Sequence, residues 1–163
     1  MNLHTMRSTE HDIQSALFSW AQLQTACYPE LALMFAIPNG GKREKRQDKK
    51  GRWFSPTAQK LKREGVKPGV PDIFLPCARG GSYGLFIEMK TPDGRVSPEQ
   101  ARVHTLLREE GYAVIVCFSL ESAITLITWY LMDHPFSEDF PKVGQSVASP
   151  RYCSADRRGI ALL

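Results

Sequence analysis

The sequence predicts an α/β fold with a mixed central sheet flanked by helices. Apolar residues recur at helical spacing in 10–26 and 120–131, and three short apolar runs at 71–76, 85–90 and 112–118 have the length and composition of strands. A glycine-rich turn joins the first two runs, which indicates an antiparallel hairpin. A predicted helix separates the last two, which indicates a parallel pair. A sheet with both kinds of pairing is mixed.

The N-terminal part is predicted to hold one long helix and one short strand. Thr9 suits the N-cap of a helix over 10–26, because Asp12 stands three residues later, where it completes a capping box. The segment 33–37 is apolar throughout and is predicted to be a short buried strand. The Pro-Asn-Gly-Gly sequence at 38–41 then predicts a turn.

Two further helices are predicted from the residues at their starts. The stretch 42–52 is basic with little apolar content and is predicted to be a loop, after which a short helix is expected over 55–63. Ser97 suits the N-cap of a helix over 97–110, because Gln100 stands at the capping-box position. This last helix connects the second and third predicted strands.

Length and composition are those of one soluble domain. With 163 residues the chain can bury a core over 1–134, and the Pro- and Ser-rich segment 135–163 is predicted to be a loosely packed tail. No apolar run approaches the roughly 18 to 20 residues that cross a bilayer, and the first residues lack a signal-peptide pattern. We therefore expect a cytoplasmic protein with no membrane partner. Four scattered cysteines argue against a zinc knuckle or a disulfide framework.

Positive charge is concentrated in one segment. Residues 39–68 contain eleven Lys or Arg against three Asp or Glu, a net +8 in a chain of net +4, so the remainder carries −4. A basic lobe on an acidic body is typical of nucleic-acid binding, although a solvated loop has the same composition. Trp53 and Phe54 are expected to pack against the core or to stack at a distorted junction. We expect DNA contacts from the loop at 39–54 and one later lysine, namely Lys42, Arg43, Lys45, Arg46, Lys49, Lys50, Arg52 and Lys67.

Three charged residues are predicted to meet at one end of the hairpin. Because strand side chains alternate between the two faces of a sheet, Glu88 and Lys90 share one face. Asp72 opens the partner strand, within reach of Glu88. Two neighbouring carboxylates repel each other, and a bound divalent cation removes that conflict. The alternative is an exposed ion pair of Glu88 and Lys90 on a sheet edge.

Such a group of residues suits the hydrolysis of phosphodiesters. A hard cation polarises the phosphoryl oxygen and makes a water molecule more acidic. Carboxylate ligands favour Mg²⁺ or Mn²⁺ over zinc, and no organic cofactor is expected. Lys90 can orient the water or stabilise the transition state. The four histidines are not clustered and receive no catalytic role, although His104 lies one turn beyond Gln100.

Five blocks of the sequence carry a resemblance to a known family. They are Ser-Thr-Glu-His-Asp-Ile-Gln at 8–14, Ile-Pro-Asn-Gly-Gly at 37–41, Gly-Val-Lys-Pro-Gly-Val-Pro-Asp at 65–72, Ile-Glu-Met-Lys at 87–90 and Ser-Pro-Glu-Gln at 97–100. In this order they resemble the VRR-NUC (virus-type replication-repair nuclease) branch of the PD-(D/E)XK nucleases. The resemblance covers about 8–131 and implies the restriction-endonuclease-like core of that superfamily.

The resemblance also implies a role for each residue at the site. The implied metal ligands are Asp72, Glu88 and the backbone carbonyl of Met89, with Glu10 as a further candidate. The implied catalytic residues are Asp72, Glu88, Lys90, Glu10 and Gln100. Glu10 and Gln100 have simpler explanations too, because an acidic residue suits the start of a helix and Gln100 completes a capping box.

Small stand-alone members of this family imply an activity as well. They resemble phage or prophage enzymes that dimerise and cut branched DNA, especially four-way (Holliday) junctions, and symmetric cleavage of a junction requires two facing sites. Three alternatives remain open: a sequence-specific restriction or homing endonuclease, a DNA-binding protein on a nuclease-like scaffold, and a ribonuclease. The first needs a recognition domain for which the chain has little room. The second is disfavoured because both acids and the lysine are present.

Overall fold

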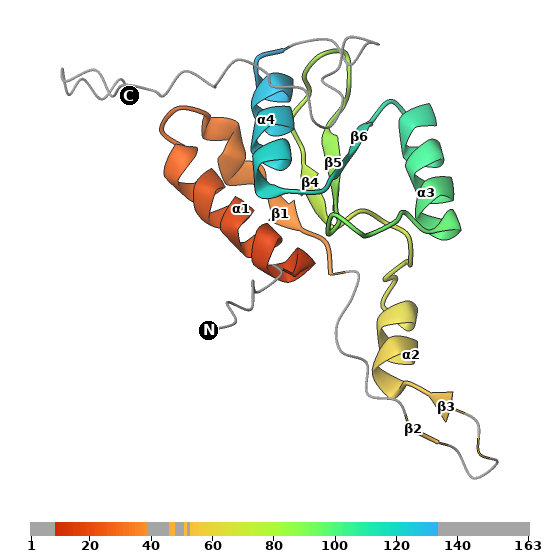
Figure 1. Ribbon diagram of the computed structural model, residues 1–163. Coiled ribbons are helices and arrows are strands. Elements are labelled where there is room, and N and C mark those ends of the chain that lie inside the picture. Colours follow the sequence, from red (N-terminus) through yellow and green to blue (C-terminus); the bar gives the residue numbers. More distant parts are fainter. Residues whose placement is uncertain (1–8, 39–45, 48–50, 52, 134–163) are drawn as a thin grey trace, which may run out of the picture.

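The computed structural model describes residues 9–38, 46–47, 51 and 53–133 (Figure 1). The tail predicted at 135–163 lies outside these residues, so the division into domain and tail stays a prediction. In chain order the elements are α1 (Glu10–Gln24), the 3-10 helix η1 (Pro29–Leu33), β1 (Phe35–Ala36), β2 (Arg46–Gln47), β3 (Trp53–Phe54), α2 (Pro56–Arg63), β4 (Ile73–Leu75), β5 (Leu85–Met89), α3 (Pro98–Glu109), β6 (Ala113–Cys117) and α4 (Leu120–Leu131). None of the helices among the described residues is long and apolar enough to cross a membrane.

The main sheet is mixed, as the sequence predicts. Its strand order is β1-β4-β5-β6, with antiparallel pairing of β1 with β4 and of β4 with β5, and parallel pairing of β5 with β6. The antiparallel register puts Ile73 opposite Ile87. One residue further along, Asp72 and Glu88 therefore come opposite each other at the open end of the hairpin.

One face of the sheet forms the apolar core with α1 and α4. The side chains of Leu85, Ile87 and Met89 alternate along β5 and are completely buried in the same cluster as Leu17 of α1 and Ile127 of α4. Figure 1 shows both helices on this side of the sheet, with α3 on the other side. The helical periodicity seen in the sequence thus corresponds to these two buried helix faces.

The opposite face of the sheet carries a cluster of aromatic side chains, and charged residues follow it along β5. Phe74 stacks on Phe86 with ring centroids 4.3 Å apart, and Tyr112 meets both rings edge-on. Strand alternation places Glu88 on the same face of β5 as Phe86. The aromatic group therefore ends at Glu88, where the site begins.

The segment 33–37 differs from the predicted buried strand. The 3-10 helix η1 extends into it, and the strand that remains, β1, has only the exposed residues Phe35 and Ala36. Phe35 is 48% exposed, whereas Leu31 and Met34 provide the buried contacts. The reason lies in the strand order, because β1 is an edge strand and apolar composition alone does not bring an edge strand into the core.

The segment 42–52 is predicted to be a loop, but it contains the short strand β2, which pairs with β3. The β2 residues Arg46–Gln47 pair antiparallel with Trp53–Phe54 of β3, and Gly51 between them has a positive φ of 75°. Aromatic residues favour strands, which explains the pairing at Trp53 and Phe54. Their side chains lie outside what the structure describes, so neither of their expected roles is tested. Figure 1 shows β2, β3 and α2 on a lobe that projects away from the main sheet.

Candidate active site

Asp72 is held at the start of β4 by the backbone of β5. Its Oδ2 accepts a hydrogen bond from the Met89 N–H at 3.0 Å, a contact that the hairpin register makes possible. Burial raises the pKa of Asp72, and the Met89 hydrogen bond and the Lys90 charge offset only part of this rise. A half-buried carboxylate of this kind is stabilised in its charged form by a nearby cation.

Glu88 and Lys90 form a buried contact at the end of β5. Glu88 is fully buried and Lys90 is 8% exposed, which excludes the alternative of an exposed ion pair. Lys90 Nζ donates to Glu88 Oε1 at 2.5 Å. Burial and, less strongly, the Asp72 charge raise the pKa of Glu88 to about 7, against the effect of the Lys90 hydrogen bond. Burial alone lowers the pKa of Lys90, but the Glu88 hydrogen bond and the nearby carboxylates raise it overall, so the amine stays charged.

Gln100 connects the start of α3 to Glu88. Its Nε2 donates to Glu88 Oε1, and its own Oε1 accepts from the Ser97 N–H at 2.9 Å. The Ser97 hydroxyl completes the capping box by accepting from the Gln100 N–H at 3.2 Å. The cap therefore orients the amide, so the same side chain completes the capping box and contacts Glu88.

Glu10 lies at the rim of the site. It is the first residue of α1, and its Oε1 is 3.8 Å from Lys90 Nζ. The Glu10 side chain is 47% exposed, in contrast to the buried Glu88. The structure thus brings all the predicted catalytic residues into one neighbourhood around Lys90, with Glu10 as the most accessible carboxylate.

His104 is a residue of this neighbourhood that the sequence analysis left without a role. It is 3% exposed, and its Nε2 lies 3.6 Å from Glu88 Oε2. Neither atom has a hydrogen-bond partner among the described residues. Burial, followed by the positive charges of Arg108 and Lys90, lowers the pKa of His104. The available signal was its spacing, because His104 follows Gln100 by four residues and so shares its helix face.

The donor atoms at this site fit a hard divalent cation. Among the described residues, no group of three or more His, Cys, Asp or Glu side chains could hold a metal ion. The predicted ligand set needs only two carboxylates, Asp72 and Glu88, and a backbone carbonyl, with water molecules for the rest. Glu88 Oε2 is a buried carboxylate oxygen without a hydrogen-bond partner in the described part of the chain. A buried carboxylate oxygen with a free lone pair, together with a set of ligands that are all oxygen atoms, suits Mg²⁺ or Mn²⁺.

All but one of the predicted DNA-contacting residues fall in the segment 39–54. Lys42, Arg43, Lys45, Lys49, Lys50 and Arg52 lie outside the described residues, and only the backbone of Arg46 is described, in β2. Lys67 is exposed, as expected of a DNA contact. Lys62 and Arg63 are also exposed, in the last turn of α2. Both belong to the basic segment 39–68, and the α2 helix sets the direction in which their side chains point.

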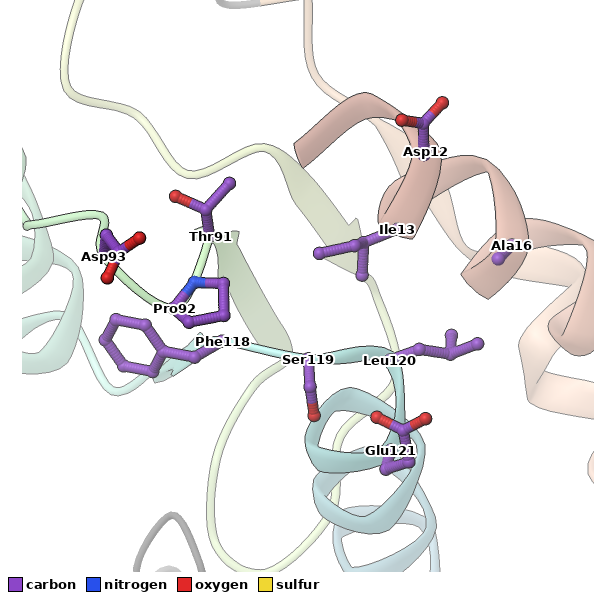
Figure 2. A pocket seen from close by; sticks show the side chains of 10 residues that line it. All are labelled: Asp12, Ile13, Ala16, Thr91, Pro92, Asp93, Phe118, Ser119, Leu120 and Glu121. Atoms are coloured by element: carbon purple, nitrogen blue, oxygen red, sulfur yellow. The ribbon is translucent and has the colours of Figure 1, made fainter. Parts of the chain in front are cut away.

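A pocket of ≈ 700 Å³ lies between the start of α1, the segment after β5 and the start of α4 (Figure 2). Its lining residues are Asp12, Ile13, Ala16, Thr91, Pro92, Asp93, Phe118, Ser119, Leu120 and Glu121. It contains none of the predicted site residues, although Thr91 directly follows Lys90. All charged side chains in its lining are acidic, which makes the pocket unfavourable for a phosphate group.

Comparisons with known proteins identify the family and the fold of the chain. The family model of the VRR-NUC domain matches residues 8–120, more than half of the chain. A solved structure described as a VRR-NUC domain protein is similar with a TM-score of 0.62 and 26% sequence identity, over 82% of this chain and 97% of that chain. No curated protein matches. The chain therefore belongs to the VRR-NUC family, has its PD-(D/E)XK-like fold and is a nuclease that acts on DNA.

Proposed function

We propose that the protein is a metal-dependent, structure-selective DNA endonuclease of a phage or prophage that cuts four-way junctions in the cytoplasm of a bacterial or infected cell. The observation that carries the catalytic part is the contact of Lys90 with the buried Glu88, next to Asp72. A buried acid, a buried amine and a second acid pinned to the same strand form a preorganised site.

Asp72, Glu88 and the Met89 carbonyl would hold Mg²⁺ or Mn²⁺, with Glu10 as a further candidate ligand from the rim. When bound there, such a cation polarises the phosphoryl oxygen and makes water more acidic. The Met89 N–H holds Asp72 in place from the same residue that would offer its carbonyl. The ligand groups are thus positioned by the β4–β5 pairing rather than by a flexible loop.

The other residues of the site act on position and charge. Lys90 keeps its positive charge and can stabilise the developing negative charge on the phosphate or orient the attacking water. Gln100 holds the Glu88 carboxylate from the α3 side. Glu10, whose Oε1 lies 3.8 Å from Lys90 Nζ, favours the charged form of the amine. We assign the role of general base to none of them.

The charge distribution suggests how DNA lies on the protein. The exposed Lys62, Arg63 and Lys67 belong to the basic segment, whereas the pocket beside Lys90 has only acidic charges in its lining. DNA phosphates would follow the basic lobe and avoid the pocket. Contacts of this kind read the backbone rather than the bases, which favours recognition of DNA structure over sequence.

Cleavage of both strands of a junction is best served by a homodimer. The exposed apolar side chains Leu23, Leu33 and Phe35, from α1, η1 and β1, are the candidates for contact with the second copy. If they make this contact, Leu33→Asp combined with Phe35→Asp should convert a dimer into a monomer in analytical ultracentrifugation. Leu106→Asp, an exposed leucine on α3, is the matched control and should leave the mass unchanged.

Cleavage of labelled four-way junction, splayed-arm, duplex and single-stranded DNA, and of RNA, with Mg²⁺, Mn²⁺ or EDTA tests the function. Asp72→Asn retains an acceptor for the Met89 N–H, and Lys90→Met retains most of the side-chain volume. Each variant should lose activity on the order of 10²-fold or more. Glu109→Gln, an exposed carboxylate on α3, is the control and should cut like wild type.

Each outcome of this experiment has a clear meaning. Metal-dependent cutting of the junction, lost in both site variants, supports the proposal. Cutting that survives in both variants refutes the active site, and cutting of RNA alone makes the enzyme a ribonuclease. Binding of the junction without cutting by wild type favours a scaffold protein instead. Cutting confined to one duplex sequence favours a restriction-type enzyme.

A further inference from the structure

The two oxygens of the Glu88 carboxylate differ in their hydrogen bonds. Its Oε1 accepts from both Lys90 Nζ and Gln100 Nε2. Its Oε2 faces His104 Nε2 at 3.6 Å, and both atoms are buried without a hydrogen-bond partner in the described part of the chain. Two such atoms rarely face each other by accident, because buried polar groups are usually satisfied.

We propose that His104 is a positioning residue of the nuclease site, which donates from Nε2 to Glu88 Oε2 when the metal site is loaded. This inference rests on the proposed role of Glu88 as a metal ligand. An N–H···O hydrogen bond needs about 2.9 to 3.2 Å, so the two side chains must approach by only a few tenths of an ångström. Because His104 is 3% exposed and Glu88 0%, water does not compete for the contact.

The helix α3 supplies both side chains that hold Glu88 from outside its own strand. Gln100 and His104 are one turn apart and meet the two oxygens of the same carboxylate. With Lys90 on Oε1, three side chains then restrain the rotation of the Glu88 carboxylate. A carboxylate fixed in this way presents its remaining lone pair, on Oε2, in one direction, and partners behind a metal ligand commonly influence metal affinity in this manner.

Three variants separate a positioning role from a purely structural one. His104→Leu removes the polar atom but keeps an apolar side chain, so the core should tolerate it. His104→Gln returns an amide nitrogen donor near the position of Nε2. Thr128→Val is the matched control, because Thr128 Oγ1 is likewise buried without a hydrogen-bond partner among the described residues, but on α4 away from the site.

The measurement is Mn²⁺ binding to the full chain by titration calorimetry, together with kcat and KM for junction DNA. His104→Leu should weaken Mn²⁺ binding and lower kcat by about 10- to 100-fold with KM for DNA nearly unchanged. His104→Gln should recover most of both, and Thr128→Val should match wild type. Thermal unfolding of all the variants should confirm that each one is folded.

Several outcomes would overturn the assignment. These are wild-type Mn²⁺ affinity in His104→Leu, no recovery in folded His104→Gln, or a loss in Thr128→Val as large as in His104→Leu. A wild type that binds no Mn²⁺ overturns it too. If wild type binds Mn²⁺ and its affinity follows the expected order in the variants, but no junction DNA is cut, the positioning role stands and the proposed junction-cutting function fails.

Discussion

The side-chain amide of Gln100 donates to the Glu88 carboxylate while its carbonyl oxygen closes the N-cap of α3 at Ser97. One residue thereby links the start of a helix to the buried acid of the site. The helix cap fixes the direction in which the amide points, so the position of Glu88 depends on how α3 begins. Because the two contacts use different atoms of the Gln100 side chain, variants can remove the contact with Glu88 and keep the one with Ser97.

Replacing Gln100 by glutamate should impair cleavage more than stability. Gln100→Glu keeps an oxygen that accepts from the Ser97 N–H, but it removes the donor to Glu88 and brings a like charge close. We expect kcat to fall about 10- to 100-fold. Ser97→Ala is the complementary control, because it removes the capping hydroxyl but keeps the Ser97 N–H that holds Gln100 Oε1. It should lose about 1 kcal/mol of stability and little activity. Steady-state cleavage and urea unfolding measure both, and the reverse pattern would contradict the link.

Gly69 should be intolerant of a side chain because α3 approaches it closely. Its φ is +84°, and a Cβ there would lie 2.9 Å from the Glu99 carbonyl oxygen. Gly65 has a similar φ of +91°, but a Cβ added there would meet nothing within 4 Å. Gly65→Ala should therefore cost only the backbone strain, about 1 to 2 kcal/mol.

Gly69→Ala should exceed that cost, because either Gly69 or the start of α3 must move. Since Gln100 follows Glu99 directly, the movement should also reduce the cleavage rate. Urea unfolding and junction cleavage of the two alanine variants compare strain alone with strain plus a clash. Equal losses of stability and equal cleavage rates in the two variants would show that the close approach of α3 to Gly69 affects neither the stability nor the active site.

The exposed basic side chains at the end of α2 and shortly after it should govern the affinity for DNA rather than the chemical step. Removing Lys62, Arg63 and Lys67 together should weaken DNA binding and flatten its salt dependence, with a change in slope of about 0.9 per lost phosphate contact. The value of kcat at saturating DNA should stay near that of wild type. Gln59→Ala, exposed on the same helix, is the control. An unchanged salt slope measured by fluorescence anisotropy would place the DNA elsewhere.

Tyr130 should add stability that disappears at alkaline pH. Its hydroxyl donates to the Cys77 carbonyl oxygen at 2.6 Å, and burial raises its pKa to about 12. Because the folded pKa lies above the ordinary value of about 10, the contribution is complete below pH 10 and is lost as the pH rises through 12. Tyr130→Phe should lose about 1 to 2 kcal/mol at pH 7, where it leaves the Cys77 carbonyl without this donor.

The difference between wild type and Tyr130→Phe should therefore shrink above pH 10. Urea unfolding at pH 7, 9 and 11 measures it. Groups that ionise at alkaline pH away from Tyr130 affect both proteins alike, so the comparison isolates Tyr130 and the neighbouring Cys77 thiol, whose charge acts on it. A difference that stays constant over this range would mean that the hydroxyl is not protected by the fold.

Local signals made much of the fold and of the site predictable. The capping boxes at Thr9 and Ser97 could be read from residues three positions apart, and both are present. The hairpin and the parallel pair that follows it were predictable from turn composition and from the intervening helix. The nearness of Asp72 to Glu88 follows from the same hairpin. Each of these features depends on neighbours in sequence, which is why the chain alone indicates them.

Long-range packing decided the rest, because burial and distance depend on elements that are remote in sequence. The apolar Phe35 is exposed since β1 is an edge strand, and Lys90 is buried despite its charge. No local pattern places His104 against Glu88, since that contact requires α3 to pack across β5. The sequence by itself indicated the candidate site residues and the class of chemistry that they suit. Only the tertiary structure decided which of them are buried and which side chain faces each carboxylate oxygen.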